Sequence, residues 1–306
     1  GGRVVNHYRN QQWSGRRVVG SEMSQRERFV FRIQPSSGWK LVDWNELVAY
    51  RDLFWFLSLR DVKVRYKQTV LGLGWAIIRP VISMVIFSII FGNLANVPSD
   101  GVPYPIFTLA ALVPWTYFSA ALTDSTQSLV ANARMLSKVY FPRLAIPMAP
   151  VLGGLIDFAI SFVILVLMMV WFGVVPTAQV WILPICLLMM IVTAAGVGLW
   201  LSTLAILYRD FRQAIAFIVQ LLMYAAPVVW PVSLLAKVGT EWESVVRLLY
   251  GFYPMAGVIE GFRASLLGTT SVPWDLLGSG AIGAIVLLIT GLLFFQRTER
   301  YFADVA

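Results

Sequence analysis

The chain has 306 residues, of which 58% are hydrophobic and only 13% carry a charge. Soluble globular domains have about 25% charged residues, so this composition excludes an ordinary soluble domain. Because the apolar residues gather into long blocks, the sequence predicts an all-α polytopic membrane protein.

The chain contains one cysteine, Cys186, and one histidine, His7. A single cysteine cannot form an internal disulfide, and a zinc site needs several converging His, Cys or carboxylate ligands. The sequence therefore predicts no metal site and no cofactor held by this chain.

Residues 1–40 form a basic leader without an apolar core, which argues against a cleaved signal peptide. The net charge of the whole chain is +8. We expect the positive charge to set the orientation in a membrane rather than to bind nucleic acid.

Residues 41–70 are predicted to form an amphipathic helix, because apolar side chains recur on one face at helical spacing. That face carries Tyr50, Leu53, Phe54 and Leu57. The charged side chains of the helix would each cost about 2.5–3.5 kcal/mol at the bilayer centre, so we expect it to lie in the interface. It is either a brace on the membrane surface or, in addition, the frame of an entry site for an anionic headgroup.

The stretch RYKQTVLGLGWAIIRP, residues 65–80, joins this helix to the first apolar block. Gly72 tolerates a positive φ and permits a tight change of direction. Arg79 lies inside the block and either snorkels to headgroups or is a cation held for a diphosphate. The candidate headgroup-entry residues are Arg65, Lys67, Leu71, Gly72 and Arg79.

Six apolar blocks within residues 71–306 have the length of about 20 residues that a helix needs to cross a bilayer. They are residues 74–96, 104–130, 144–172, 178–207, 213–235 and 276–296. A semi-apolar stretch, residues 236–275, separates the last two spans.

Lysine and arginine residues fall almost entirely on one side of these spans. Lys237, Arg247 and Arg263 alone fall on the other side. Since positively charged loops stay in the cytoplasm, both termini are predicted to be cytoplasmic.

Asp124 and Asp157 are the acidic residues in the middle of predicted spans. An intramembrane carboxylate suggests a function by default. Neither residue, however, has a His or Lys partner at helical spacing, which favours a buried helix–helix contact over a proton relay.

Aromatic residues make up 14% of the chain, and many belong to an interfacial belt. The second span combines aromatic with hydroxyl side chains, which suits either helix packing or contact with a polar cargo. The candidate pathway residues are Trp75, Trp115, Tyr117, Phe118, Tyr224 and Trp230.

The connection between the second and third spans, residues 131–143, combines cations with aromatic residues, which are favoured in docking patches. The alternative is a positively charged membrane anchor. Because the chain has no G-x-x-x-x-G-K-[ST] phosphate loop, ATP-driven transport would need a separate ATPase. The candidate coupling residues are Arg134, Lys138, Tyr140, Phe141, Pro142 and Arg143.

Several of these segments together resemble the membrane subunits of bacterial ABC exporters of polysaccharides. They are RDVKVRYKQTVLGLGWAIIRP (60–80), NARMLSKVYFPRLAIP (132–147), YRDFRQ (208–213) and YPMAGVIEGFRASLLG (253–268). The resemblance extends from Trp39 to Phe302, and the segment YKQTVLG places it nearest the O-antigen branch.

The resemblance implies a multi-pass permease of the bacterial inner membrane that exports a polysaccharide linked to polyprenyl diphosphate. It implies a homodimer, surrounded by membrane lipid, with two cytoplasmic ABC ATPase subunits that bind ATP and Mg²⁺. It places Leu71-Gly72 near the cytoplasmic entrance, residues 131–143 at the ATPase, and short re-entrant helices within 236–275 on the outer side.

Two other functions remain open on the sequence. A membrane transferase or ligase acting on a lipid-linked glycan would need catalytic groups in an outer loop, and residues 236–275 offer Arg and Glu but no histidine. A stand-alone channel would conduct without an ATPase. Within the family, teichoic acid or capsule export is the alternative to O-antigen export.

Overall fold

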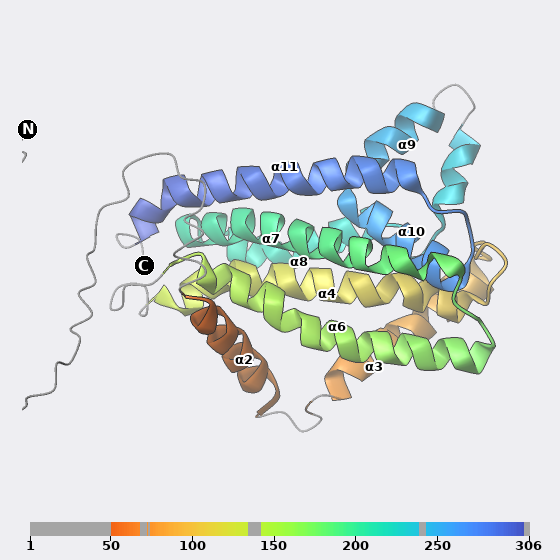
Figure 1. The fold of residues 1–306 in the computed structure, drawn as a ribbon, viewed down its shortest axis with the longest axis horizontal. Coiled ribbons are helices and arrows are strands. Elements are labelled where there is room, and N and C mark those ends of the chain that lie inside the picture. Colours follow the sequence, from red (N-terminus) through yellow and green to blue (C-terminus); the bar gives the residue numbers. More distant parts are fainter. Residues whose placement is uncertain (1–49, 68–71, 73, 134–141, 239–242, 303–306) are drawn as a thin grey trace, which may run out of the picture. The chain divides into compact units, whose positions relative to one another are not determined.

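The computed structural model describes residues 50–67, 72, 74–133, 142–238 and 243–302. The chain divides into two units, residues 1–39 and 40–306, and all described residues belong to the second unit. Every regular element among them is a helix (Figure 1). This confirms the predicted all-α membrane fold class.

Five helical segments of the described residues are long and apolar enough to cross a membrane. Their boundaries agree with five of the predicted spans to within a few residues. The first, Gly74–Leu94, consists of α3 (Gly74–Phe87) and the π-helical turn η1 (Ser88–Leu94). The others are α4 (Tyr104–Ala131), α6 (Ala145–Phe172), η2 (Ala178–Ile182) with α7 (Leu183–Leu207), and α11 (Trp274–Thr298).

The predicted fifth span, residues 213–235, is wrong in its extent. Helix α8 (Phe211–Ala225) has 15 residues, which gives a length of about 22 Å against a hydrocarbon core of about 30 Å. The chain leaves the helix at Ala226, where φ is −80° and ψ is 147°. This extended conformation follows from Pro227, because proline disfavours a helical conformation in the residue before it.

Helix α4 lies at the centre of the spans and contacts α3, α6, α7, α8 and α10. In its most apolar stretch 78% of the residues are buried, against 11% for Gly74–Leu94 and 17% for α6. The centre of the bundle is therefore filled by the side chains of α4, whereas few residues are buried in the most apolar stretches of Gly74–Leu94 and α6.

Helices α7 and α11 approach each other closely through glycine. A Cβ atom added to Gly196 of α7 would lie 2.6 Å from the backbone nitrogen of Leu288 on α11. Small residues allow such backbone contact between membrane helices, which explains a glycine in the middle of an apolar helix.

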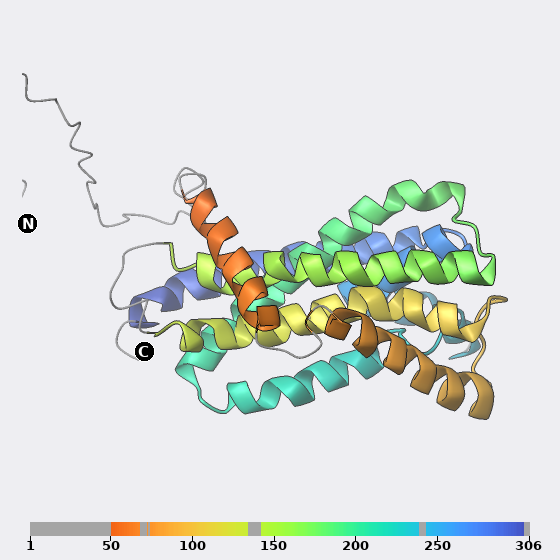
Figure 2. The ribbon, with the colours of Figure 1, turned by 90° about the horizontal axis from the view of Figure 1, so that it is seen from below.

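The two ends of the helical bundle differ in construction (Figures 1 and 2). One end, called the proximal end, holds residues 132–133, 142–144, 208–210 and 299–302. The other end, called the distal end, holds residues 95–103, 173–182, 226–238 and 243–274. Three short helices lie at the distal end, η3 (Val232–Val238), α9 (Glu243–Gly251) and α10 (Pro254–Leu267), as expected for the segment before the last span. All 14 residues of α10 are buried.

Helix α2 (Arg51–Lys67) packs on α6. Its predicted apolar face makes this contact, since Leu53, Phe54 and Leu57 pack with Ala145 and Ala149 at the start of α6. On its other side α2 exposes Trp55 and Phe56. The predicted position of this helix in the membrane interface remains a prediction.

Candidate functional site

Four of the predicted headgroup-entry residues, Arg65, Lys67, Gly72 and Arg79, are described, and they lie around the point where α2 ends and α3 begins. Arg65 is in the last turn of α2 and forms ion pairs with both intramembrane acids, Asp124 of α4, at 2.6 Å, and Asp157 of α6. The hydroxyl of Tyr66 also donates a hydrogen bond to Asp157. One guanidinium therefore joins three helices.

This arrangement gives the two acids a partner that sequence spacing did not suggest. Burial by itself would lower the pKa of Arg65, but the charges of Asp124 and Asp157 outweigh it and raise that pKa. The guanidinium consequently stays charged. Its hydrogen-bonding groups are directed at the two carboxylates, so Arg65 contributes to the packing of α2 as well as to the charge of the entry site.

Arg79 differs from Arg65 in its surroundings. It lies about one and a half turns into α3, it is exposed, and among the described residues it forms no ion pair within 4 Å. Its guanidinium lies 5.7 Å from the ring of Trp75, which is itself 41% exposed. A guanidinium that lies over an indole ring can still bind an anion on the side that faces away from the ring. Lys67 is likewise exposed at the end of α2.

The turn between the two helices depends on Gly72. Its φ is +48°, and no atom lies within 4 Å of the position that a Cβ would occupy. The glycine is therefore required by backbone conformation rather than by lack of space. Leu71 lies outside the described residues.

Three of the six predicted pathway aromatics are buried within the chain. Trp115, Tyr117 and Phe118 of α4 are each at most 3% exposed, and the Tyr117 hydroxyl donates to the carbonyl of Val151 on α6 at 2.9 Å. These side chains fill the core of the helical bundle. The polar face expected on α4 is also internally satisfied, because hydroxyls donate to carbonyls three or four residues earlier.

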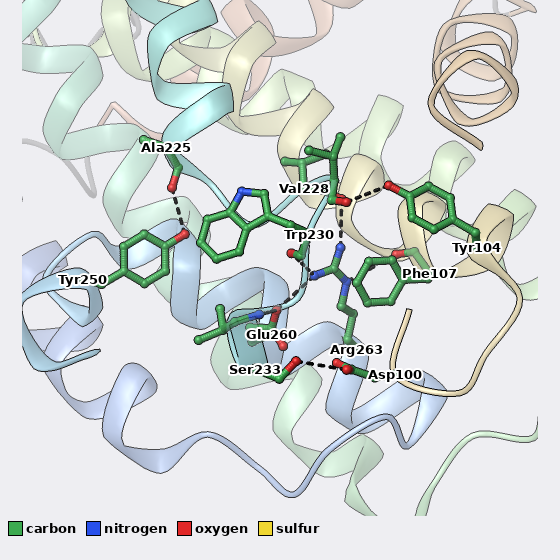
Figure 3. A network of polar contacts seen from close by, with 12 residues as sticks. Asp100, Tyr104, Phe107, Ala225, Val228, Trp230, Ser233, Tyr250, Glu260 and Arg263 are labelled. Carbon is green, nitrogen blue, oxygen red and sulfur yellow. Dashed lines mark hydrogen bonds and ion pairs between the residues drawn. The ribbon is translucent and has the colours of Figure 1, made fainter. Parts of the chain in front are cut away.

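The other predicted pathway aromatics are accessible. Trp75 lies beside Arg79, and Tyr224 of α8 is 63% exposed. Trp230 is half-buried at the distal end, with its ring 5.7 Å from that of Tyr250 (Figure 3). The predicted pathway role of all six remains a prediction, and the structure separates them into a buried and an accessible group.

Of the predicted coupling residues, Pro142 and Arg143 are described, and Arg134, Lys138, Tyr140 and Phe141 lie outside the described residues. Arg143 forms an ion pair with Glu299 at 3.7 Å and donates a hydrogen bond to the carbonyl of that residue. It therefore ties the start of α6 to the end of α11. Nearby at the proximal end, a pocket of about 360 Å³ is lined by Gln127, Val130, Ala131 and Arg212.

The distal end contains an ion pair that the sequence analysis missed. Glu260 and Arg263 of α10 are 2.9 Å apart, with side chains 5% and 0% exposed. The sequence counted Arg263 among the charges of an outer loop. Its spacing of three residues from Glu260 was the available signal, since it places opposite charges on one helix face.

No group of three or more His, Cys, Asp or Glu side chains in the described part of the chain converges as a metal site would require. The described residues thus offer cations, aromatic faces, partly exposed ion pairs and one buried ion pair.

Comparison with known proteins places these features in a family. Residues 52–267 match the family model described as ABC-2 type transporter. The O-antigen export system permease protein RfbA of Klebsiella pneumoniae is 26% identical over 255 residues, which are 83% of this chain and 95% of that protein. RfbA of Myxococcus xanthus is 24% identical, over 85% of this chain and 97% of that protein. The polysialic acid transport protein KpsM of Escherichia coli is 22% identical, over 80% and 92%.

These matches confirm the resemblance seen in the sequence. They also confirm the prediction of a transport subunit over the alternative of a glycan transferase, because the relatives are permease and transport proteins.

Proposed function

Because the chain belongs to the ABC-2 type transporter family, we propose that it is the permease of an ATP-driven exporter of polyprenyl-diphosphate-linked polysaccharide. O-antigen is the proposed cargo, since the more similar relatives are O-antigen export permeases and the capsule transporter KpsM is more distant. Hydrolysis of ATP with Mg²⁺ belongs to two separate ATPase subunits.

The distribution of charge supports a cytoplasmic proximal end in the bacterial inner membrane. Arg209, Arg212, Arg297 and Arg300 lie there. At the distal end, Arg263 is buried and Arg247 is paired with Asp275, so neither is a free loop cation. This strengthens the asymmetry from which orientation is inferred.

A second copy of the chain is part of the proposal. The centre of one protomer is filled by α4, whereas α8 buries only Ile215 and exposes Phe217, Leu221 and Tyr224. A glycan needs aromatic faces on which to stack without a charge that would trap it. A pathway between two copies, lined by α8, satisfies this need.

The observation that carries the proposed substrate is the exposed guanidinium of Arg79 beside Trp75. A diphosphate that leaves the headgroup region loses water, and this is costly unless a cation replaces it. Arg65 is already paired with two carboxylates. Arg79, with Lys67 at the surface, is therefore the proposed receptor of the headgroup.

The test uses the permease–ATPase complex in proteoliposomes with a polyprenyl-diphosphate glycan. Arg79→Ala is expected to reduce glycan export and the stimulation of ATP hydrolysis by substrate, while basal hydrolysis persists. Arg79→Lys is expected to restore only part of the stimulation, since lysine lacks the planar fork of arginine.

Arg51→Ala is the matched control, because Arg51 is an exposed cation of α2 paired with an exposed Asp52. It should leave both activities unchanged. Normal export by Arg79→Ala at matched protein levels would show that Arg79 is only a snorkelling anchor.

A further inference from the structure

Helix α8 stops short of the length of a membrane span, and a non-helical segment of turns and bends, residues 226–231, joins it to η3. Pro227 and Pro231 lie in this segment, and proline supplies no backbone N–H. Helical hydrogen bonding therefore ends, and the carbonyl groups at the break lose their usual partners. Inside a membrane protein such groups must find partners within the protein.

Side chains from three other helices supply those partners (Figure 3). The hydroxyl of Tyr250 on α9 donates to the carbonyl of Ala225 at 2.8 Å. The hydroxyl of Tyr104 on α4 donates to the carbonyl of Val229 at 2.6 Å. Tyr253, just before α10, donates to the carbonyl of Leu222 at 3.1 Å, which also accepts the N–H of residue 226.

Arg263 and Glu260 of α10 complete the set. The guanidinium of Arg263 donates to the carbonyls of Val228 at 2.8 Å and Trp230 at 3.3 Å. The carboxylate of Glu260 accepts the backbone N–H of Val232 at 3.2 Å. The charged pair thus binds two carbonyl groups of the non-helical segment and the backbone N–H with which η3 begins.

The same guanidinium also fixes the segment to the central helix. Arg263 donates to the carbonyl of Phe107 on α4 at 3.3 Å. The Cζ atom of its guanidinium lies 3.6 Å from the centre of the Phe107 ring. Because α4 and α10 are buried, the segment is attached to the most closely packed part of the protomer.

Helix α8 contrasts with this rigid attachment. Along its 15 residues only Ile215 is buried. Its orientation therefore depends more on how its distal end is held than on contacts along its length.

We infer that Tyr250, Tyr253, Glu260 and Arg263 are positioning residues that set the angle of α8 at a hinge formed by residues 226–231. The charged pair holds the hinge against α4, and the two tyrosines hold the last turn of α8 to α9 and to the start of α10. The functional consequence rests on the proposed function, in which the exposed face of α8 borders the glycan pathway. The positioning itself does not rest on it.

The experiment measures the position of α8 in the full-length chain, in lipid nanodiscs, by electron-spin distances. Spin labels are attached at Phe217→Cys on α8 and Leu188→Cys on α7, both exposed sites. The native Cys186 is buried, and excess unlabelled chain ensures that each measured pair lies within one protomer.

The test variant is the double substitution Tyr250→Phe and Tyr253→Phe, which removes two hydroxyls without changing the shape of the rings. Each lost hydrogen bond is expected to shift the balance of α8 positions by about fivefold, so a second distance population should appear. Arg263→Lys, which cannot reproduce the planar fork, should broaden the distribution further if it folds.

Tyr117→Phe is the matched control, because it also removes a hydroxyl bound to a carbonyl, but that carbonyl belongs to Val151 on α6 and not to α8 or the hinge. It should leave the distances unchanged. An unaltered distribution in the Tyr250→Phe, Tyr253→Phe variant would overturn the inference, and so would an equal change in Tyr117→Phe.

A second measurement separates positioning from the headgroup proposal. In the complex with the ATPase, the double variant is expected to lower the maximal substrate-stimulated rate while the half-saturating substrate concentration stays the same. An increase in that concentration at an unchanged maximal rate would contradict a positioning role. If Arg79→Ala exports normally, the headgroup proposal fails while the distance result stands.

Discussion

Arg65 of α2 forms an ion pair with Asp157 of α6, although the two residues are 92 positions apart in the chain. The same guanidinium also binds Asp124 of α4. The attachment of the first helix to the membrane core thus depends on a charge triad as well as on apolar packing.

The two acids of this triad should differ in their contribution to stability. Asp157 has two partners, Arg65 and Tyr66, and its side chain is 21% exposed, whereas Asp124 has one and is 42% exposed. Asp157→Asn is expected to lower the free energy of unfolding by about 1–3 kcal/mol. Asp124→Asn should cost less than about 1 kcal/mol, because the pair is more solvated.

Thermal unfolding of the purified chain in detergent, monitored by tryptophan fluorescence, measures this order. Asp52→Asn is the control, since Asp52 forms an exposed pair with Arg51 and should have no effect. A larger loss from Asp124→Asn than from Asp157→Asn would contradict the assignment of partners.

Gly72 should be sensitive to the backbone preference of its replacement and not to its size. The site has a φ of +48° and no neighbouring atom near a Cβ. Gly72→Val is expected to impair export, because a β-branched residue strains that conformation, whereas Gly72→Asn should retain most activity. Export at matched expression levels tests this, and equal loss in both variants would point to crowding instead.

The close contact of α7 and α11 predicts contrasting effects of two Gly→Ala substitutions. At Gly196 the added methyl would meet backbone atoms of Leu287 and Leu288, whereas at Gly278 of α11 it would meet no atom within 4 Å. Gly196→Ala is expected to destabilise the chain by about 1–3 kcal/mol. Gly278→Ala should be neutral or stabilise it slightly, because alanine favours the helix. Unfolding midpoints of the two variants give the comparison.

The buried and accessible aromatics should separate stability from transport. Phe118→Ala leaves a cavity in the core and is expected to cost about 3–5 kcal/mol of unfolding free energy. Tyr224→Ala changes an exposed side chain, so its effect on stability should stay within about 0.5 kcal/mol, while export should fall. Unfolding and export are measured on the same preparations. Normal export by stable Tyr224→Ala would remove Tyr224 from the pathway.

The sequence by itself determined the membrane class, five of the spans, the apolar face of α2 and the turn at Gly72. Hydropathy and helical periodicity are local properties, so a single sequence reveals them. Proline is also local, yet the end of α8 at Ala225 was missed because the apolar composition continues through Pro227 and masks the break.

The tertiary structure alone decided which charges meet and which aromatics are accessible. Arg65 finds acids 59 and 92 positions away, and Arg263 finds carbonyl groups 33, 35 and 156 positions away. Neither set of partners can be read from a repeating spacing in the sequence, because it depends on which faces of different helices pack against each other. For the same reason Trp115 and Tyr224 look alike in the sequence, yet one fills the core and the other stays exposed on α8.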